Sequence, residues 1–215
     1  SALTGLRPAV WMNGRTVDKP AEGNACRDLV QSFMQGSLRN RPDVDLNAYY
    51  ILALNKEPNI SVIDPLMGLG TSKLITLVML ESPGADWVLL GDGKKLFVTM
   101  PLAHRVAVID TATWKVALNI DVEGGPTRLA IQPDGKYLWV ASDAEQQGGV
   151  TVIDVASMQK VARIATGAGH HELAFTSDDR YAFVTNSQDG ALSVIDIRRL
   201  KKVKDVKTGR RPSAI

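Results

Sequence analysis

The stretch Val150-Thr151-Val152-Ile153-Asp154 ends in a tripeptide that the chain repeats. Val-Ile-Asp occurs four times, and its copies end at Asp64, Asp110, Asp154 and Asp196, with spacings of 46, 44 and 42 residues. A run of β-branched residues closed by an acid is typical of a buried strand that ends in a turn. The near-constant spacing indicates that one structural unit recurs along the chain.

Each of the last three copies follows a turn and an apolar run. The pairs are Gly91–Lys94 before Leu96–Thr99, Pro133–Lys136 before Tyr137–Val140, and Ser177–Arg180 before Tyr181–Val184. Asp-Gly in the first two turns supplies the left-handed backbone that a tight hairpin needs. The pattern therefore predicts a hairpin ahead of each tripeptide.

The third repeat can be divided into four strands, at roughly 128–132, 136–142, 149–154 and 159–165. A helical interpretation fails because the apolar runs are short, separated by turns and without caps. One sheet has two faces to bury, and sheets packed around an axis cover both. The sequence therefore predicts an all-β fold, a β-propeller of about four blades of four-stranded antiparallel sheet.

The repeats place the blades in residues 48–215, with ends near 80, 122, 166 and 208. No convincing first strand precedes the first repeat, and residues 210–215 match the opening of a further blade. The ring is thus expected to be incomplete, and we favour a fragment of a longer propeller. Two alternatives stay open: residues 213–215 could complete the first blade, or two chains could join into one eight-bladed ring.

Residues 1–47 do not fit the repeat and are expected to form an irregular arm. A short helix is predicted at Ala25–Gly36, where Leu29, Phe33 and Met34 share one face. Such an arm could cover an open edge of the propeller or dock onto a partner subunit.

Composition excludes several classes of protein. The 215 residues are 45% hydrophobic and 22% charged, which is enough to bury a core, and the formal net charge of +2 does not favour nucleic acid binding. No apolar run is long enough for a transmembrane helix. The lone Cys26 can form no internal disulfide, and the absence of a Cys-x-x-Cys-His motif excludes covalently attached haem on this chain.

The segments Tyr181–Asn186 and Ala191–Asp196 resemble the repeat of the YVTN family of bacterial β-propellers, also called YncE-like proteins. This family is similar to the haem-d1 domain of cytochrome cd1 nitrite reductases, and the likeness covers about residues 48–215. The resemblance implies a periplasmic or secreted bacterial protein. It also implies a protein partner or another subunit, because the family includes binding and scaffold modules, dehydrogenase subunits and a group that holds haem d1.

All three histidines are expected at one end of the blades. His104 lies between the second and third strands of its blade, and His170 and His171 lie between blades. Imidazole can ligate copper, iron or zinc. The leading expectation is that one histidine of the pair packs against a strand, the other is solvated, and no cofactor is bound. The alternative is that His170 and His171 are cofactor ligands, with haem d1 or copper as the candidates, and that His171 and His104 are metal ligands.

Arg210 and Arg211 fall on the same end and are the candidates for binding a partner. They follow a basic outer strand that contains Lys201, Lys202, Lys204 and Lys207. This blade could bind an anionic partner or phosphate. The alternative is a solvated outer strand without a binding role.

Conventional catalytic motifs are absent from the sequence, which has no Gly-x-Ser-x-Gly, Walker or His-Glu-x-x-His pattern. We therefore expect a binding or scaffold protein of the cell envelope, not an enzyme, that is a subunit or fragment of a larger assembly. The alternative is a cofactor-bearing redox module of the haem-d1 type, with His170 or His171 as ligand.

Overall fold

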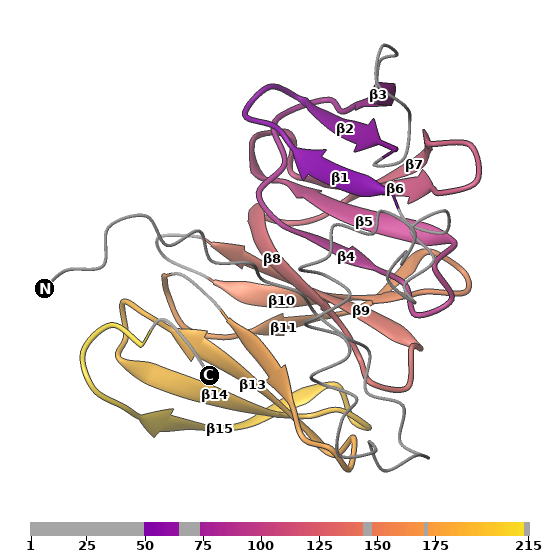
Figure 1. Cartoon of the computed structure of the whole chain (residues 1–215). Coiled ribbons are helices and arrows are strands. Elements are labelled where there is room, and N and C mark those ends of the chain that lie inside the picture. The colour runs from indigo at the N-terminus through magenta and orange to yellow at the C-terminus, as the bar shows by residue number, and fades with distance from the viewer. Residues whose placement is uncertain (1–49, 65–73, 144–147, 170–171, 213–215) are drawn as a thin grey trace, which may run out of the picture. The chain divides into compact units, whose positions relative to one another are not determined.

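The computed structural model describes residues 50–64, 74–143, 148–169 and 172–212, and these form fifteen strands in four antiparallel sheets (Figure 1). The first two sheets contain β1 (Ile51–Leu54), β2 (Asn59–Ile63) and β3 (Leu74–Met79), then β4 (Trp87–Leu89), β5 (Lys95–Met100), β6 (Arg105–Asp110) and β7 (Lys115–Asp121). The last two contain β8 (Gly125–Ile131), β9 (Tyr137–Asp143), β10 (Gly149–Asp154) and β11 (Gln159–Ala165), then β12 (Leu173–Phe175), β13 (Tyr181–Asn186), β14 (Ala191–Asp196) and β15 (Lys201–Lys207).

These sheets confirm the predicted all-β repeat. In each four-stranded sheet the strands pair in chain order, and the sheet of the first repeat has three strands within the described residues. In the third repeat, β10 and β11 have the expected bounds, whereas β8 begins earlier than expected, at Gly125. It does so because Gly125 and Pro126 still pair with β9, across an irregularity in register before Arg128.

The Val-Ile-Asp tripeptides mark the same bend in every sheet. The pairing of the third strand with the fourth shifts register between the valine and the isoleucine in all four copies. The aspartates then close the following turn: Asp110 Oδ1 accepts the Thr113 N–H at 2.9 Å, and Asp154 Oδ1 accepts the Ser157 N–H at 2.7 Å. These tripeptides are structural, as predicted, since the bulge belongs to the fold of each unit and the capped turn to the three units in which the residues after the aspartate are described.

The predicted hairpin turns also form. Gly93 and Gly135 adopt left-handed backbone with φ of 72° and 73°, and Asp179 takes that conformation in the fourth sheet with φ of 53°. In the first of these turns, Asp92 Oδ1 accepts the Lys94 N–H at 2.9 Å. Aspartate can replace glycine here because its short polar side chain tolerates this region.

Three apolar clusters each join two successive sheets. One joins the first and second sheets, the next joins the second and third, and the last joins the third and fourth. Trp139 illustrates the last: it is fully buried, and its ring meets Phe175 edge-on at 5.6 Å between centroids. Its Nε1–H donates to Gln132 Oε1 at 3.3 Å. Burial of this kind on both faces is what makes single blades depend on their neighbours.

The sequence also made predictions about helices, one in residues 25–36 and the absence of any that spans a membrane. The helix expected at residues 25–36 lies outside the described residues. Within the described part of the chain, no helix is long and apolar enough to cross a membrane.

Candidate functional site at the loop end

The turns between second and third strands meet the loops between sheets at one end of the blades, which we call the loop end. His104 Nδ1 lies 2.7 Å from the Gly124 carbonyl oxygen, and the Ala168 N–H donates to Asp189 Oδ2 at 2.7 Å. The Thr208 N–H donates to the Gly190 carbonyl at 2.8 Å. These bonds confirm that the two kinds of loop share an end, as strand alternation predicts.

His104 is the described histidine at this end. It follows the 3₁₀ turn η2 (Pro101–Ala103) in left-handed conformation, and its carbonyl accepts the Val122 N–H at 2.9 Å. Because the Gly124 carbonyl can only accept, Nδ1 carries the hydrogen that donates to it, and in the tautomer with this single hydrogen Nε2 has the lone pair. This is the orientation in which a protein histidine offers Nε2 to a metal.

The other two predicted histidines, His170 and His171, lie outside the described residues. Their roles as cofactor or metal ligands therefore stay predictions. In the ranges that the structure describes, no three His, Cys, Asp or Glu side chains gather as a metal site.

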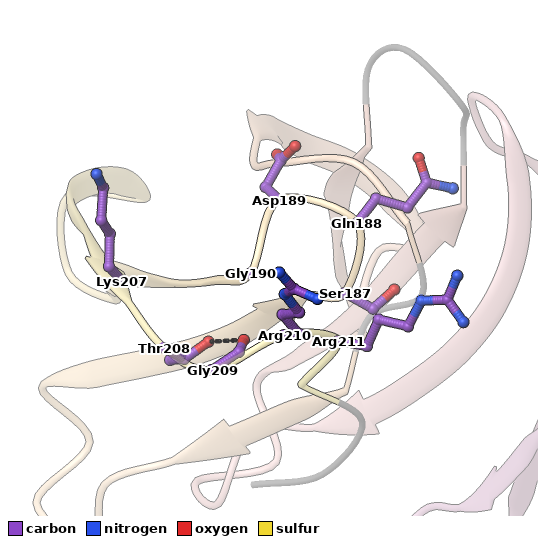
Figure 2. A pocket seen from close by; sticks show the side chains of 9 residues that line it. All are labelled: Ser187, Gln188, Asp189, Gly190, Lys207, Thr208, Gly209, Arg210 and Arg211. Carbon is purple, nitrogen blue, oxygen red and sulfur yellow. Dashed lines mark hydrogen bonds between the residues drawn. The ribbon is translucent and has the colours of Figure 1, made fainter.

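A groove of about 770 Å³ opens at the loop end of the fourth sheet, and Figure 2 shows its lining. Its walls are the β13–β14 turn, residues 187–190, and the segment that leaves β15, residues 207–211. Lys207, Arg210 and Arg211 bring three positive charges to it, against the single carboxylate of Asp189. The predicted partner-binding arginines are thus brought together in one concave, electropositive surface.

One wall of the groove is fixed by the loop from the preceding sheet. The Gln188 N–H donates to the Ala168 carbonyl at 3.1 Å, beside the bond from Ala168 to Asp189. Gly169 has φ of 99°, and a Cβ there would lie 2.5 Å from Ser187 Oγ. Glycine is required at this position because any side chain would push the two loops apart.

A chain of polar side chains crosses the fourth sheet to the same wall. Lys202 Nζ donates to Asp205 Oδ2 at 2.8 Å, and Ser193 Oγ donates to Asp205 Oδ1 at 2.6 Å. Asn186 Nδ2 donates to Ser193 Oγ at 2.9 Å, and Asn186 Oδ1 accepts the Gly167 N–H at 2.9 Å. Burial acts to raise the pKa of Asp205, but the bonds from Lys202 and Ser193 outweigh it and lower this pKa.

Charged residues also share one repeat position, just before or within the first strand of each of the last three sheets. The position is the one before the residue that pairs with a buried valine of the second strand. It holds Asp86 in the second sheet (before the partner of Val98), Arg128 in the third (Val140) and Glu172 in the fourth (Val184). Arg128 Nε donates to Glu172 Oε1 at 2.8 Å, and this bond is the main cause that raises the pKa of Arg128. Asp86 Oδ2 accepts the Leu129 N–H at 3.1 Å. These contacts tie three successive sheets together beside the loop end.

Sequence reasoning missed two of these features. It identified Arg210 and Arg211 but not the 187–190 wall, although the rule that places both loops at one end would have found it. It also missed the alternating charges at Asp86, Arg128 and Glu172. An alignment of the repeats on their second strands reveals that set.

The repeated sheets and shared clusters define a β-propeller, and solved structures agree. The chain aligns with Kuenenia stuttgartiensis hydrazine synthase at a TM-score of 0.60 and 23% identity, over 69% of this chain and 42% of that one. It aligns with a putative 6-phosphogluconolactonase from Bacteroides uniformis at a TM-score of 0.64 and 15% identity, over 77% of this chain and 53% of that one. At these identities the likeness concerns the fold.

The model of the Cytochrome D1 heme domain family matches residues 46–215, so the chain belongs to that family. Protein NirF from Pseudomonas aeruginosa is 28% identical over 148 residues, which are 69% of this chain and 36% of NirF. The chain thus spans about a third of the length of this curated relative. The predicted relation to the haem-d1 domain is confirmed at the level of the family, and the narrower YVTN grouping stays a prediction.

Proposed function

We propose that this chain is a binding module of the bacterial cell envelope that works within a larger assembly and holds its ligand or partner at the loop end. The observation that carries the proposal is the electropositive groove formed by residues 187–190 and 207–211. Rigid sheets hold these loops in place, which is how repeat folds commonly present a binding surface. The cell-envelope location is supported by the resemblance to periplasmic and secreted propellers.

The loop end offers both charge and apolar surface to a partner. Arg210 and Arg211 are exposed at the groove, and Leu102, two residues before His104, is 78% exposed. Arginine and large apolar side chains are the kinds of residue on which protein contacts depend. A partner that reaches across several loops would use both.

A photo-cross-linking amino acid placed at Arg211 tests this proposal. The variant, expressed in a bacterial periplasm and irradiated, should form a discrete adduct with a partner or ligand. The matched control carries the same amino acid at Arg199, in the β14–β15 turn at the other end of the sheet. Adducts of equal yield from both positions, or from neither, would contradict binding at the loop end.

The second candidate is a cofactor-bearing redox module of the haem-d1 type, which the family match favours. His104 would be able to hold the iron of such a group, since its Nδ1–H is held by the Gly124 carbonyl and Nε2 is left as a ligand atom. His170 and His171 stay candidates for the same role. A bound haem d1 would supply redox chemistry through its iron, and these histidines would orient it.

Visible absorption separates the two candidates. A redox module purified from its host should be coloured, and His171→Ala or His104→Ala should shift or bleach the haem bands. A colourless protein that also takes up no added haem would count against the redox module. The binding module would then be the remaining candidate.

A further inference from the structure

We infer that the groove between the β13–β14 turn and the end of β15 binds a small organic molecule with two or more oxyanion groups, carboxylates or phosphates. This inference rests on the proposed function, because it names the class of ligand that the loop end would hold. Three observations support it: the charge of the groove, the direction of the two arginine side chains that line it, and its volume.

Among the described residues, the three cations of the groove outnumber its one carboxylate. None of Lys207, Arg210 and Arg211 forms an ion pair with another described residue. The carboxylate in the lining, Asp189, accepts the Ala168 N–H and is thereby directed to the loop between sheets. Neighbouring cations repel one another, so an anion bound between them is stabilised.

The backbone directs both arginines to the groove. In an extended strand, consecutive side chains point to opposite faces. Arg211 instead has left-handed backbone with φ of 53°, which interrupts that alternation, and both arginines line the groove. Figure 2 shows the side chains of Arg210 and Arg211 extending from this segment beside the 187–190 turn, with Lys207 further out. Two planar guanidinium groups can each bind one carboxylate or phosphate through paired hydrogen bonds.

The size of the groove favours an organic ligand over a single inorganic ion. Its volume of about 770 Å³ lies within the range of small-molecule sites. Gln188 and Thr208 add amide and hydroxyl groups to the lining, which suit the polar atoms of such a molecule. A ligand that spans the two arginines and reaches Lys207 needs separated anionic groups.

Calorimetric titration of the full chain at low salt tests this inference, with citrate as the carboxylate probe and pyrophosphate as the phosphate probe. At least one probe should bind the wild-type chain, and Arg210→Gln/Arg211→Gln should weaken that binding tenfold or more. The matched control is Arg198→Gln/Arg199→Gln, which removes the same two charges from the β14–β15 turn and should change affinity less than twofold. Circular dichroism checks that both variants keep the wild-type sheet content.

The probe that binds identifies the source of the oxyanion. Binding that falls equally in both double variants would mean a general effect of net charge and would overturn the inference. Wild-type binding that neither variant changes, or no binding of either probe, would also overturn it. A cross-link at position 211 obtained alongside such a failure would leave the proposed function standing with a different class of ligand.

Discussion

At the scale of single residues, the aspartates of Val-Ile-Asp have a defined structural role. Asp110 and Asp154 accept backbone and hydroxyl hydrogen bonds in the turns that follow them. The backbone bond from Thr113 is the main cause that lowers the pKa of Asp110, and the bond from Ser157 does the same for Asp154. Each carboxylate is therefore favoured in its charged form in the folded state.

These shifts predict a pH dependence of stability. A folded-state pKa below the unfolded value adds stability above the unfolded pKa, and this stability is lost as pH falls through the folded pKa. The wild-type chain should lose the stability contributed by Asp110 and Asp154 as the pH falls from about 5 to about 2. Asp110→Asn/Asp154→Asn should show a smaller fall of Tm over that range, measured by circular dichroism. Asp134→Asn, in a hairpin turn at the same end, is the control, and an unchanged slope in the double variant would contradict the account.

Some local structure was beyond sequence reasoning at this scale. Trp114, Met158 and Leu200 occupy one position in three repeats, and all have left-handed backbone, with φ of 52°, 58° and 51°. Nothing in these residue types favours that conformation. It is imposed by the turn between third and fourth strands, where Trp114 N–H bonds the Asp110 carbonyl and Met158 N–H bonds that of Asp154.

At the scale of elements, the sheet of β1–β3 presents an apolar face to solvent. Ile51, Leu77 and Met79 lie on one face and are 53%, 45% and 63% exposed. On the matching face of the second sheet, Val98 and Ala107 are fully buried in the cluster shared with the first sheet, and the position that corresponds to Met79 is taken by the exposed carboxylate of Asp121. We propose that a second copy of the chain covers this face, as in a ring completed by two chains.

Charges placed on this face should prevent such pairing. The wild-type chain should sediment as a dimer, and the Leu77→Lys/Met79→Lys variant should sediment with the smaller coefficient of a monomer, because ammonium groups buried in the interface oppose association. Val161→Lys/Val203→Lys is the matched control, since these valines are 46% and 56% exposed on the outer strands β11 and β15. A wild-type chain that sediments as a monomer, or a dimer that survives Leu77→Lys/Met79→Lys, would refute pairing through this face.

At the scale of the whole molecule, the repeat period was enough to predict the sheets, their order and the shared end of the loops. It could do so because each blade depends on local pairing and on its direct neighbours. The groove was harder to predict, since it requires residues 187–190 and 207–211 to lie together. Two sets of roles remain predictions: partner binding by Arg210 and Arg211, and ligand binding by His104, His170 and His171. Whether a histidine or an arginine binds a ligand depends on the residues around it in space, which the repeat pattern does not specify.

Native mass spectrometry of the chain purified from a bacterial periplasm tests the central claim, binding at the loop end, most directly. The account predicts a mass above the 23.3 kDa of the chain, or above its double, with the excess lost in Arg210→Gln/Arg211→Gln and kept in Arg198→Gln/Arg199→Gln. A bare mass for all three proteins, or the same excess on all three, would contradict it.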